Sequence, residues 1–355
     1  MPAPVRLGLL FVLWLILISG LHHYLNHRPA DRPVVRMGYM PVVTNLAAPL
    51  LDHVTNHAAD IFFQAVKFSS FAEMAEALRN DSIQAAFIIA PLAVVLRQQG
   101  VDVKVVLIGN RHESTLVAKK SLNAKRLEDL VDCTIAVPMR YSGHNLGLME
   151  MINEKGLGGR IRVVEMNPPD MASALTTGAL DAYFVGEPFA AQTVLSADAD
   201  VVAYVESFWP GFICNLVLVK NSWIKAQPTV VSQLVETAVR SGLWADRHPD
   251  ETARIVSAYW NQSDDLVRYA LNTPSGRVVY NRYVPKAAEI QVMADLMRRY
   301  GLIEHADIGG LVEDRFALEA NVEGIDTVDS ILANCLVPAQ MAKFFPNGPQ
   351  FAGHE

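Results

Sequence analysis

Two residues whose side chains exchange protons stand at predicted turns. His144 lies in the sequence YSGHN, among small residues at a predicted helix start, and Glu187 lies in VGEPF before a proline that opens a helix. An imidazole there can donate a hydrogen bond to an oxyanion, although a lone histidine is more often structural. A carboxylate beside a bound anion would repel it. Glu187 therefore either caps its helix or contacts the ligand. In the second case it must be protonated, be paired with His144 or a cation, or accept a proton from the ligand.

Polar and aromatic side chains accompany these two residues at other predicted turns. Thr44, Asn45 and Ser142 have the residue types of helix N-caps, and capping alone explains each of them. Phe71 follows two serines, where it either stacks on a planar ligand or faces the core of an amphipathic helix. We expect a binding site because these positions converge. The full candidate set is Thr44, Asn45, Phe71, Glu113, Ser114, Ser142, His144, Pro169, Gly186, Glu187 and Pro188.

An internal repeat predicts how these residues are positioned. The sequence EMAEALRNDSIQAAF at 73–87 aligns without gaps with DMASALTTGALDAYF at 170–184, a constant offset of 97. Pro91 falls on Pro188 at the same offset, and each proline opens a helix after a strand. Asn45 and Leu46 fall on Asn145 and Leu146 at an offset of 100. A duplication of one structural unit is the simplest explanation.

Each repeat reads as strand, helix, strand, helix, strand. The predicted strands are 34–40, 61–68 and 83–90 in the first repeat and 134–139, 161–166 and 180–186 in the second. Such alternation predicts mainly parallel sheets covered on both faces. Ligands of open α/β sheets bind beyond the carboxyl ends of the strands, at helix N-termini. The sequence therefore predicts two doubly wound α/β lobes whose strand ends face a shared cleft.

The strand predicted at 212–220 defines how the lobes connect. If this strand returns to the first sheet, two crossings join the lobes, near Lys119 and near Trp209, as a two-strand hinge. The first lobe is then residues 34–120 plus 210–332, the second is 121–209, and 333–355 forms a tail. Residues 228–301 are predicted to be helical, with starts at Pro228, Pro249 and Pro285, and to pack around the first lobe.

The first 33 residues are predicted to be an export signal or a membrane anchor. Arg6 precedes an apolar run from Leu7 to Ile18 that reaches Leu21, after which polar residues follow. About 15 apolar residues suit a signal peptide better than a membrane span of about 20. The cleavage site after Ser19 and Gly20 is poor, so an uncleaved anchor remains an alternative.

The overall composition excludes several classes of function. The net charge is −7 with no dense basic run, which argues against a nucleic-acid partner. The three cysteines, Cys133, Cys214 and Cys335, are widely spaced, so we expect free thiols and neither a disulfide framework nor a metal site. No nucleophile elbow, zinc-protease, Walker or dinucleotide motif occurs. We therefore expect a binding protein without a cofactor rather than an enzyme.

The motifs resemble the NitT/TauT class of ABC solute-binding proteins, also called NMT1-like or SsuA/THI5-like, and are nearest to its nitrate- and bicarbonate-binding branch. The matching sequences are GYMPVVTNLAAPLL at 38–51, HNL at 144–146, NPPDM at 167–171 and GALDAYFVGEPF at 178–189. In that branch the positions of His144, Pro169, Gly186, Glu187 and Pro188 line an oxyanion pocket. Phe71 departs from a tryptophan of the branch, Glu113 or Ser114 departs from a glutamine, and Asn215 is the nearest polar residue where the branch has a lysine.

The resemblance implies a type II periplasmic binding protein that captures a small solute for an ABC permease and its ATPase. Nitrate, bicarbonate or a sulfonate is the expected solute, and the departures leave a pyrimidine or another heterocyclic vitamin precursor open. The wider class includes pyrimidine-synthesising enzymes, but their iron motif rich in histidine and cysteine is missing. An anchored sensor is a further alternative. The implied location is the periplasm, with membrane contact only through the N-terminal segment or the permease.

Overall fold

A computed structural model describes residues 3–26 and 32–332 of the chain. The chain divides into two compact units, Met1–Val34 and Val35–Glu355. The first unit contains helix α1 (Ala3–Asn26). No helix among the described residues combines the length and the apolar character that crossing a bilayer requires. The assignment of residues 1–33 as an export signal or anchor stays a prediction, and the tail predicted at 333–355 lies outside the described residues.

Two five-stranded sheets organise the second unit. The first has the strand order β2-β1-β3-β10-β4 and the second has the order β7-β6-β8-β5-β9. The strands of the first sheet are β1 (Val34–Tyr39), β2 (Phe62–Lys67), β3 (Ala85–Ile89), β4 (Val103–Ile108) and β10 (Asn215–Lys220). The strands of the second sheet are β5 (Ser114–Lys119), β6 (Thr134–Val137), β7 (Arg162–Glu165), β8 (Ala182–Gly186) and β9 (Ala199–Tyr204).

Each sheet contains one strand that runs antiparallel to both of its neighbours. Strand β10 pairs antiparallel with β3 and β4, whereas β5 pairs antiparallel with β8 and β9. The remaining pairings of β1 with β3 and of β6 with β7 and β8 are parallel. Both sheets are thus mixed, because one antiparallel strand is inserted among strands that run parallel as predicted, and the strand at 212–220 does return to the first sheet.

The first crossing between the sheets differs from its predicted position. Strand β4 ends at Ile108 in the first sheet, and β5 begins at Ser114 in the second. The chain therefore changes sheet at 109–113 and not near Lys119, and residues 114–120 do not belong with the first lobe. The reason is that an apolar β-rich run does not reveal which sheet it joins. The second change of sheet falls between Tyr204 and Asn215, a range that includes Trp209.

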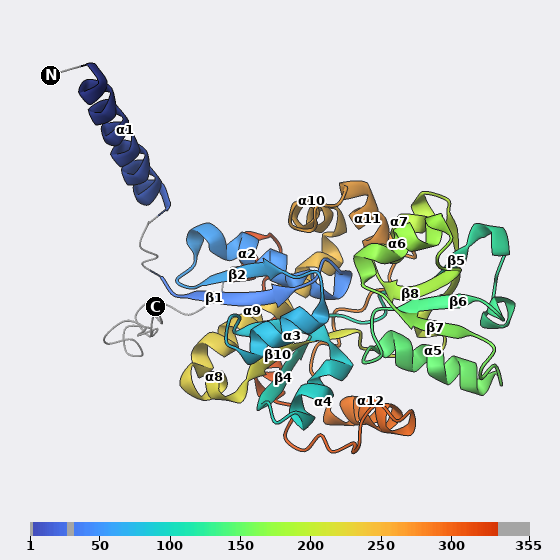
Figure 1. The fold of residues 1–355 in the computed structure, drawn as a ribbon. Helices are drawn as coiled ribbons and strands as arrows, with labels where there is room; N and C mark the ends of the chain where they lie inside the picture. Colours follow the sequence, from blue (N-terminus) through green and yellow to red (C-terminus); the bar gives the residue numbers. More distant parts are fainter. Residues whose placement is uncertain (1–2, 27–31, 333–355) are drawn as a thin grey trace. The chain divides into compact units, whose positions relative to one another are not determined.

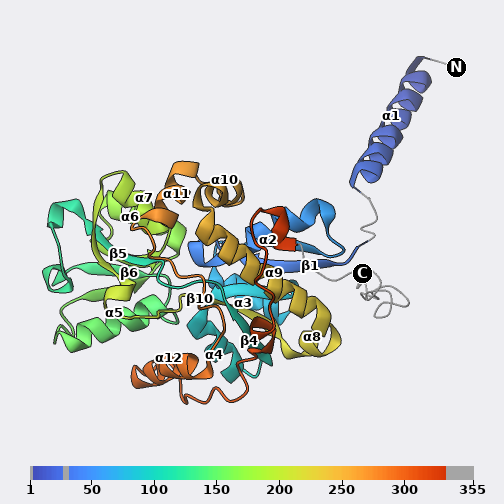
Figure 2. The same ribbon diagram turned by 180° about the vertical axis from the view of Figure 1, so that it is seen from behind.

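Helices cover both faces of each sheet (Figures 1 and 2). In the first sheet, α2 (Ala47–Ala58) and α9 (Pro228–Arg247) pack on one face, and α3 (Phe71–Arg79) and α4 (Ala90–Gln98) pack on the other. In the second sheet, α5 (Gly143–Glu154) lies opposite α6 (Pro168–Thr177) and α7 (Phe189–Leu195). The repeat is confirmed in register, because β3 shifted by 97 residues coincides with β8.

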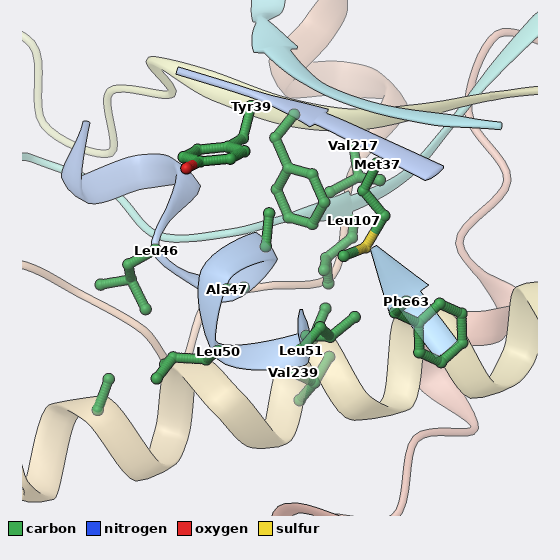
Figure 3. Close-up of a cluster of buried hydrophobic side chains, with 14 of the residues drawn as sticks. Met37, Tyr39, Leu46, Ala47, Leu50, Leu51, Phe63, Leu107, Val217 and Val239 are labelled. Atoms are coloured by element: carbon green, nitrogen blue, oxygen red, sulfur yellow. The ribbon is translucent and has the colours of Figure 1, made fainter. Parts of the chain in front are cut away.

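The largest apolar core lies between the first sheet and helices α2 and α9. Figure 3 shows Met37 and Phe63 of the sheet facing Leu50, Leu51 and Val239 of the two helices. Both leucines are fully buried. A buried leucine side chain contributes about 2 kcal/mol relative to an exposed one. This core holds the first sheet rigid, so that the turns beyond its strands keep their positions.

The last third of the described chain is mainly helical, and some of its helices pack against the second lobe as well as the first. These helices are α8 (Asn221–Ala226), α10 (Pro249–Trp260), α11 (Asp264–Asn272), α12 (Ala287–Arg299) and α13 (Arg315–Leu318). The predicted helix starts at Pro228 and Pro249 are confirmed, whereas the helix predicted to start at Pro285 is α12, which begins at Ala287. Helix α11 packs on α7, and α12 packs on both α4 and α5. We predicted that this segment packs around the first lobe. The structure shows that it also contacts the second lobe.

Candidate functional site

The pairing of β5 with β8 brings the two predicted carboxylates side by side. Ser114 lies opposite Gly186 in this antiparallel pair, which places Glu113 next to Glu187. The Glu187 backbone N–H donates to Glu113 Oε2 at 2.7 Å, and the Ser114 hydroxyl donates to Glu113 Oε1 at 3.0 Å. Glu113 is fully buried, and this burial raises its pKa to about 7, although hydrogen bonds from Cys214 and Ser114 oppose the rise.

His144 enters the same region from the first turn of α5. The Ser142 hydroxyl caps this helix by accepting from the Asn145 backbone N–H at 3.1 Å, which confirms capping for Ser142. His144 Nε2 lies 2.9 Å from Ser114 Oγ and 3.9 Å from Cys214 Sγ. Its ring packs edge-on against Phe184 and Phe212. Burial lowers the pKa of His144 to about 3, so the imidazole is neutral at physiological pH.

Glu187 is paired with a cation that sequence reasoning missed. Arg277 NH1 lies 3.6 Å from Glu187 Oε1, and both side chains are buried. The carboxylate also accepts from the Thr115 hydroxyl at 2.7 Å and from the Ala191 backbone N–H at 2.8 Å. Among the alternatives set out from the sequence, the structure thus combines a cation partner with capping of α7. Burial still raises the pKa of Glu187, and Arg277 is the main opposing influence.

Arg277 carries several further contacts that hold it in place. It donates to the Thr115 hydroxyl at 2.9 Å, to the Ser114 carbonyl and to Glu206, and its guanidinium lies over the ring of Tyr204. The residue sits between α11 and α12 in the sequence TPSGRVVY. No helical or strand periodicity marks this stretch. A basic residue followed by three apolar ones was the only available signal that the side chain turns inward.

The crossing cluster, defined as Glu113, His144 and Cys214, joins three separate segments. Glu113 precedes β5, His144 begins α5, and Cys214 precedes β10. One ligand-type atom from each residue lies within 4.8 Å of the other two, and all three side chains are buried. Cys214 is a free thiol, and burial raises its pKa well above the usual value. Sequence reasoning expected free thiols but did not place Cys214 beside the site.

Other predicted site residues are engaged in the local structure. Asn45 donates to the Phe87 carbonyl at 3.0 Å and accepts from the Asn215 side chain at 2.7 Å, so its amide joins β3 to β10. Thr44 is buried on the short 3-10 helix Val43–Asn45. Pro188 is buried and precedes α7. Pro169 is exposed, whereas its neighbour Pro168 is buried.

A cavity of about 420 Å³ opens between the two lobes. We call it the inter-lobe cavity. The start of α3 lines one side, and the turns after β6 and β7 line the other, so residues of both sheets' layers contribute. Its lining residues are Ser70, Phe71, Ala72, Pro138, Met139, Glu165, Met166, Asn167, Pro168 and Asp170. Phe71 is thus at the cavity wall, although its side chain is also largely buried in an apolar cluster.

A larger hollow, the α5 groove, was not predicted. It has a volume of about 690 Å³ and lies along α5 and β7. Its lining is mainly apolar and includes Val137, Met149, Ile152, Val163 and Leu302. Arg140 lines it too, but its guanidinium is paired with Glu165 at 3.0 Å. This groove is the alternative place for a ligand.

Gly186 supports the carboxylate pair through its lack of a side chain. A Cβ atom there would lie 2.6 Å from Glu113 Oε2, an oxygen already held by the Glu187 backbone N–H. We expect Gly186→Ala to lower the free energy of unfolding by about 1 to 3 kcal/mol because the carboxylate must shift. Gly158→Ala is the control, since nothing lies within 4 Å of its Cβ position. Urea unfolding of both variants tests this, and equal losses would contradict it.

The chain matches the family described as NMT1-like over residues 28–260, which is more than half of its length. It belongs to the NMT1-like family. The taurine-binding periplasmic protein of Escherichia coli (strain K12) is 28% identical over 179 residues, covering 49% of this chain and 54% of that protein. The alignment thus spans only about half of the length of that relative.

Solved structures share the fold of this NMT1-like protein. The ligand-binding component of an ABC-type import system from Staphylococcus aureus, with zinc bound, has a TM-score of 0.74 at 21% identity, covering 82% of this chain and 100% of that chain. The periplasmic nitrate-binding protein NrtA from Synechocystis PCC 6803 has a TM-score of 0.69 at 14% identity, covering 91% and 93%. The predicted periplasmic-binding-protein fold is therefore confirmed.

Proposed function

We propose that this NMT1-like protein is the solute-binding component of an ABC-type importer. The observation that carries the proposal is the inter-lobe cavity, which residues from both sheets' layers line at helix starts and strand ends. A cavity shared by two lobes can close around a small solute and release it when the lobes separate. Its partner is then a permease with an ATPase, and its location is the periplasm, reached through the N-terminal segment.

The chemistry of the crossing cluster supports binding over catalysis. Burial keeps the Cys214 thiol protonated, since its pKa lies well above the usual value, and a thiol is a poor nucleophile. His144 has a lowered pKa of about 3, which makes its imidazole a weak base at neutral pH. Neither residue is poised for proton or acyl transfer. The names of the related proteins, which are binding proteins, point the same way.

The two sides of the inter-lobe cavity differ in the charge they favour. Helix α3 begins at Phe71, and the positive end of its dipole attracts an anion, although the Ser70 hydroxyl already accepts from the Ala72 N–H and Glu73 in the first turn weakens the attraction. Helix α6 begins with Pro168 and Pro169, which lack N–H groups, and carries Asp170 in its first turn. The α3 side therefore suits an oxyanion, and the α6 side suits an ammonium group.

A solute with both groups matches this lining better than a bare inorganic anion. No arginine or lysine lines the inter-lobe cavity among its described residues, while Glu165 and Asp170 do. Nitrate or bicarbonate would meet the Asp170 carboxylate and that of Glu165, whose partner Arg140 does not line this cavity. Taurine carries a sulfonate and an ammonium group, and the curated relative binds taurine by its name. We therefore propose an aminosulfonate of this kind as the solute, in place of the bare oxyanion expected from the sequence.

Thermal unfolding in the presence of candidate solutes tests the proposal. A solute that binds only the folded protein raises the melting temperature in a saturable manner. We expect taurine to raise it more than ethanesulfonate, which differs only in lacking the amine, and more than nitrate or bicarbonate. Equal shifts from taurine and ethanesulfonate would refute the role of the amine. A response to pyrimidines alone would favour a heterocycle, and no response to any compound would count against solute binding.

Two cavity variants and one control locate the solute. Asn167→Ala and Phe71→Ala alter the inter-lobe cavity, whereas Met149→Ala alters only the α5 groove. We expect the first two to weaken the taurine response at least tenfold in concentration, measured against the melting temperature of each variant alone. Asn167 is exposed, so its replacement should not impair folding. A response lost in Met149→Ala but kept in Asn167→Ala would move the site to the α5 groove.

A further inference from the structure

The crossing cluster has the composition of a metal site. It offers a carboxylate from Glu113, an imidazole nitrogen from His144 and a sulfur from Cys214. The exposed fractions of these residues are 0%, 1% and 3%. They come from three distant parts of the chain, so only the fold assembles them. Spacing along the sequence gave no indication of a metal site, because the residues lie at 113, 144 and 214.

The distances within the cluster suit a small tetrahedral cation. Zinc binds sulfur at about 2.3 Å and nitrogen or oxygen at about 2.0 to 2.2 Å, which separates neighbouring ligand atoms by roughly 3.3 to 3.7 Å. His144 Nε2 lies 3.9 Å from Cys214 Sγ, and the three ligand atoms lie within 4.8 Å of one another. A displacement of side chains by less than about 1 Å would complete this geometry.

We propose that Glu113, His144 and Cys214 form a binding site for a thiophilic divalent cation of the zinc type. The fourth ligand is the Ser114 hydroxyl or a water molecule. Ser114 Oγ lies 2.9 Å from His144 Nε2 and 3.0 Å from Glu113 Oε1. A thiolate and an imidazole select late transition metals over magnesium or calcium, which prefer oxygen ligands.

The charges that the cluster carries once a metal displaces the Cys214 thiol proton suit a divalent cation. A carboxylate and a thiolate together neutralise a divalent ion, so the loaded site carries no net charge in the apolar interior. The nearby guanidinium of Arg277 is committed to Glu187 and Glu206. It lies close enough to influence Glu113 but donates no hydrogen bond to it among the described contacts. Glu113 is thus held by hydrogen bonds from Ser114 and the Glu187 N–H, and no salt bridge of Glu113 is among the described contacts.

The position of the cluster gives the cation a structural consequence. Glu113 lies on the first crossing between the sheets and Cys214 on the second, while His144 belongs to the second sheet's layer. A cation bound by all three ties both crossings to α5. The site is separate from the inter-lobe cavity, whose lining includes none of the three residues. The inference therefore stands or falls independently of the solute proposed above.

Metal titration of the purified full chain, made without a histidine tag and stripped with a chelator, tests this site. We expect one equivalent of Zn²⁺ to bind, and Co²⁺ to produce the near-ultraviolet charge-transfer absorption of a cobalt thiolate. Cys214→Ser should abolish this absorption and weaken Zn²⁺ binding at least tenfold. Cys133→Ser is the matched control, because this other free cysteine lies outside the cluster and should change neither readout.

A second variant guards against misfolding of Cys214→Ser. His144→Gln keeps the thiol, so it should retain some cobalt thiolate absorption while weakening Zn²⁺ binding at least tenfold, with an unchanged circular dichroism spectrum. The proposal is overturned if the stripped wild-type chain shows no cobalt thiolate absorption, or if Cys214→Ser binds Zn²⁺ as tightly as wild type. The taurine response of the stripped protein is measured in parallel, so loss of one function is distinguished from loss of the other.

Discussion

Replacing Arg240 with methionine is expected to lower the free energy of unfolding by about 3 to 5 kcal/mol. Arg240 lies in α9 and is fully buried. Its guanidinium donates to five backbone carbonyls on the segment that follows α13. These carbonyls belong to Asn321, Glu323, Gly324, Ser330 and Ile331. Methionine fills a similar volume but donates nothing, so the carbonyls lose their partners in an apolar surrounding.

Besides Arg240, the buried side chains of Ile325 and Ile331 anchor this segment, and we expect the loss of Arg240 to act locally as well as globally. Ile331 is buried against the core of the first sheet, and its carbonyl accepts from Arg240 at 2.9 Å. We expect limited proteolysis to cut the variant between residues 318 and 332 well before wild type is cut there. Such cleavage would report local opening of the segment, since opening exposes backbone to the protease.

Arg247→Met is the control for Arg240→Met because it changes the same residue type in the same helix. Arg247 is exposed, and its side chain donates to the Leu243 carbonyl at 3.2 Å. Its replacement should cost less than about 0.5 kcal/mol. Urea unfolding followed by circular dichroism measures both variants. If the two variants lose similar amounts, the five carbonyl contacts do not stabilise the protein as we expect.

Replacing Arg277 with methionine is expected to cost about 3 to 5 kcal/mol at pH 8, because Glu187 is left buried without its counter-charge. The loss should be smaller at pH 5. Without Arg277 the pKa of Glu187 in the folded protein rises further above its value in the unfolded chain. Stability linked to such a carboxyl group is present below the unfolded pKa and is lost as pH rises through the folded pKa. The destabilisation must therefore grow with pH.

A double-mutant cycle isolates the interaction of Arg277 with Glu187. Glu187→Gln removes the charge but keeps the shape of the side chain, so Arg277→Met should cost much less in that background and should lose its dependence on pH. Arg282→Met is the control, because Arg282 is half exposed and pairs with Glu289. Its replacement should cost under about 1 kcal/mol. Additive losses from Arg277→Met and Glu187→Gln would contradict the pairing.

The repeat and the strand ends were predictable because they depend on local pattern. The offset of 97 residues placed β3 on β8 and α3 on α6, and the structure keeps that register. Proline and small residues marked the helix starts at Ala90 and Gly143. Candidate residues at turns and strand ends could therefore be named, and five of them do meet. These are Glu113, Ser114, His144, Gly186 and Glu187.

The partners of those residues depended on pairings that are distant in the chain. Arg277 reaches Glu187 only because the segment after α11 packs against the second sheet, and no periodicity marks that segment. Cys214 reaches His144 only because β10 returns to the first sheet. The position of the first crossing was wrong for the same reason, since β5 could have joined either sheet.

The amino-acid sequence by itself determined the duplicated α/β architecture and the turns at which the chemistry lies. Hydrophobic periodicity, proline placement and internal similarity are local properties of the chain, and they survive without knowledge of contacts. Only the tertiary structure shifted the pKa values of Glu113, Glu187 and His144 and brought Cys214 beside Glu113 and His144. Burial and neighbouring charges determine a pKa, and both come from segments that the order of residues leaves far apart.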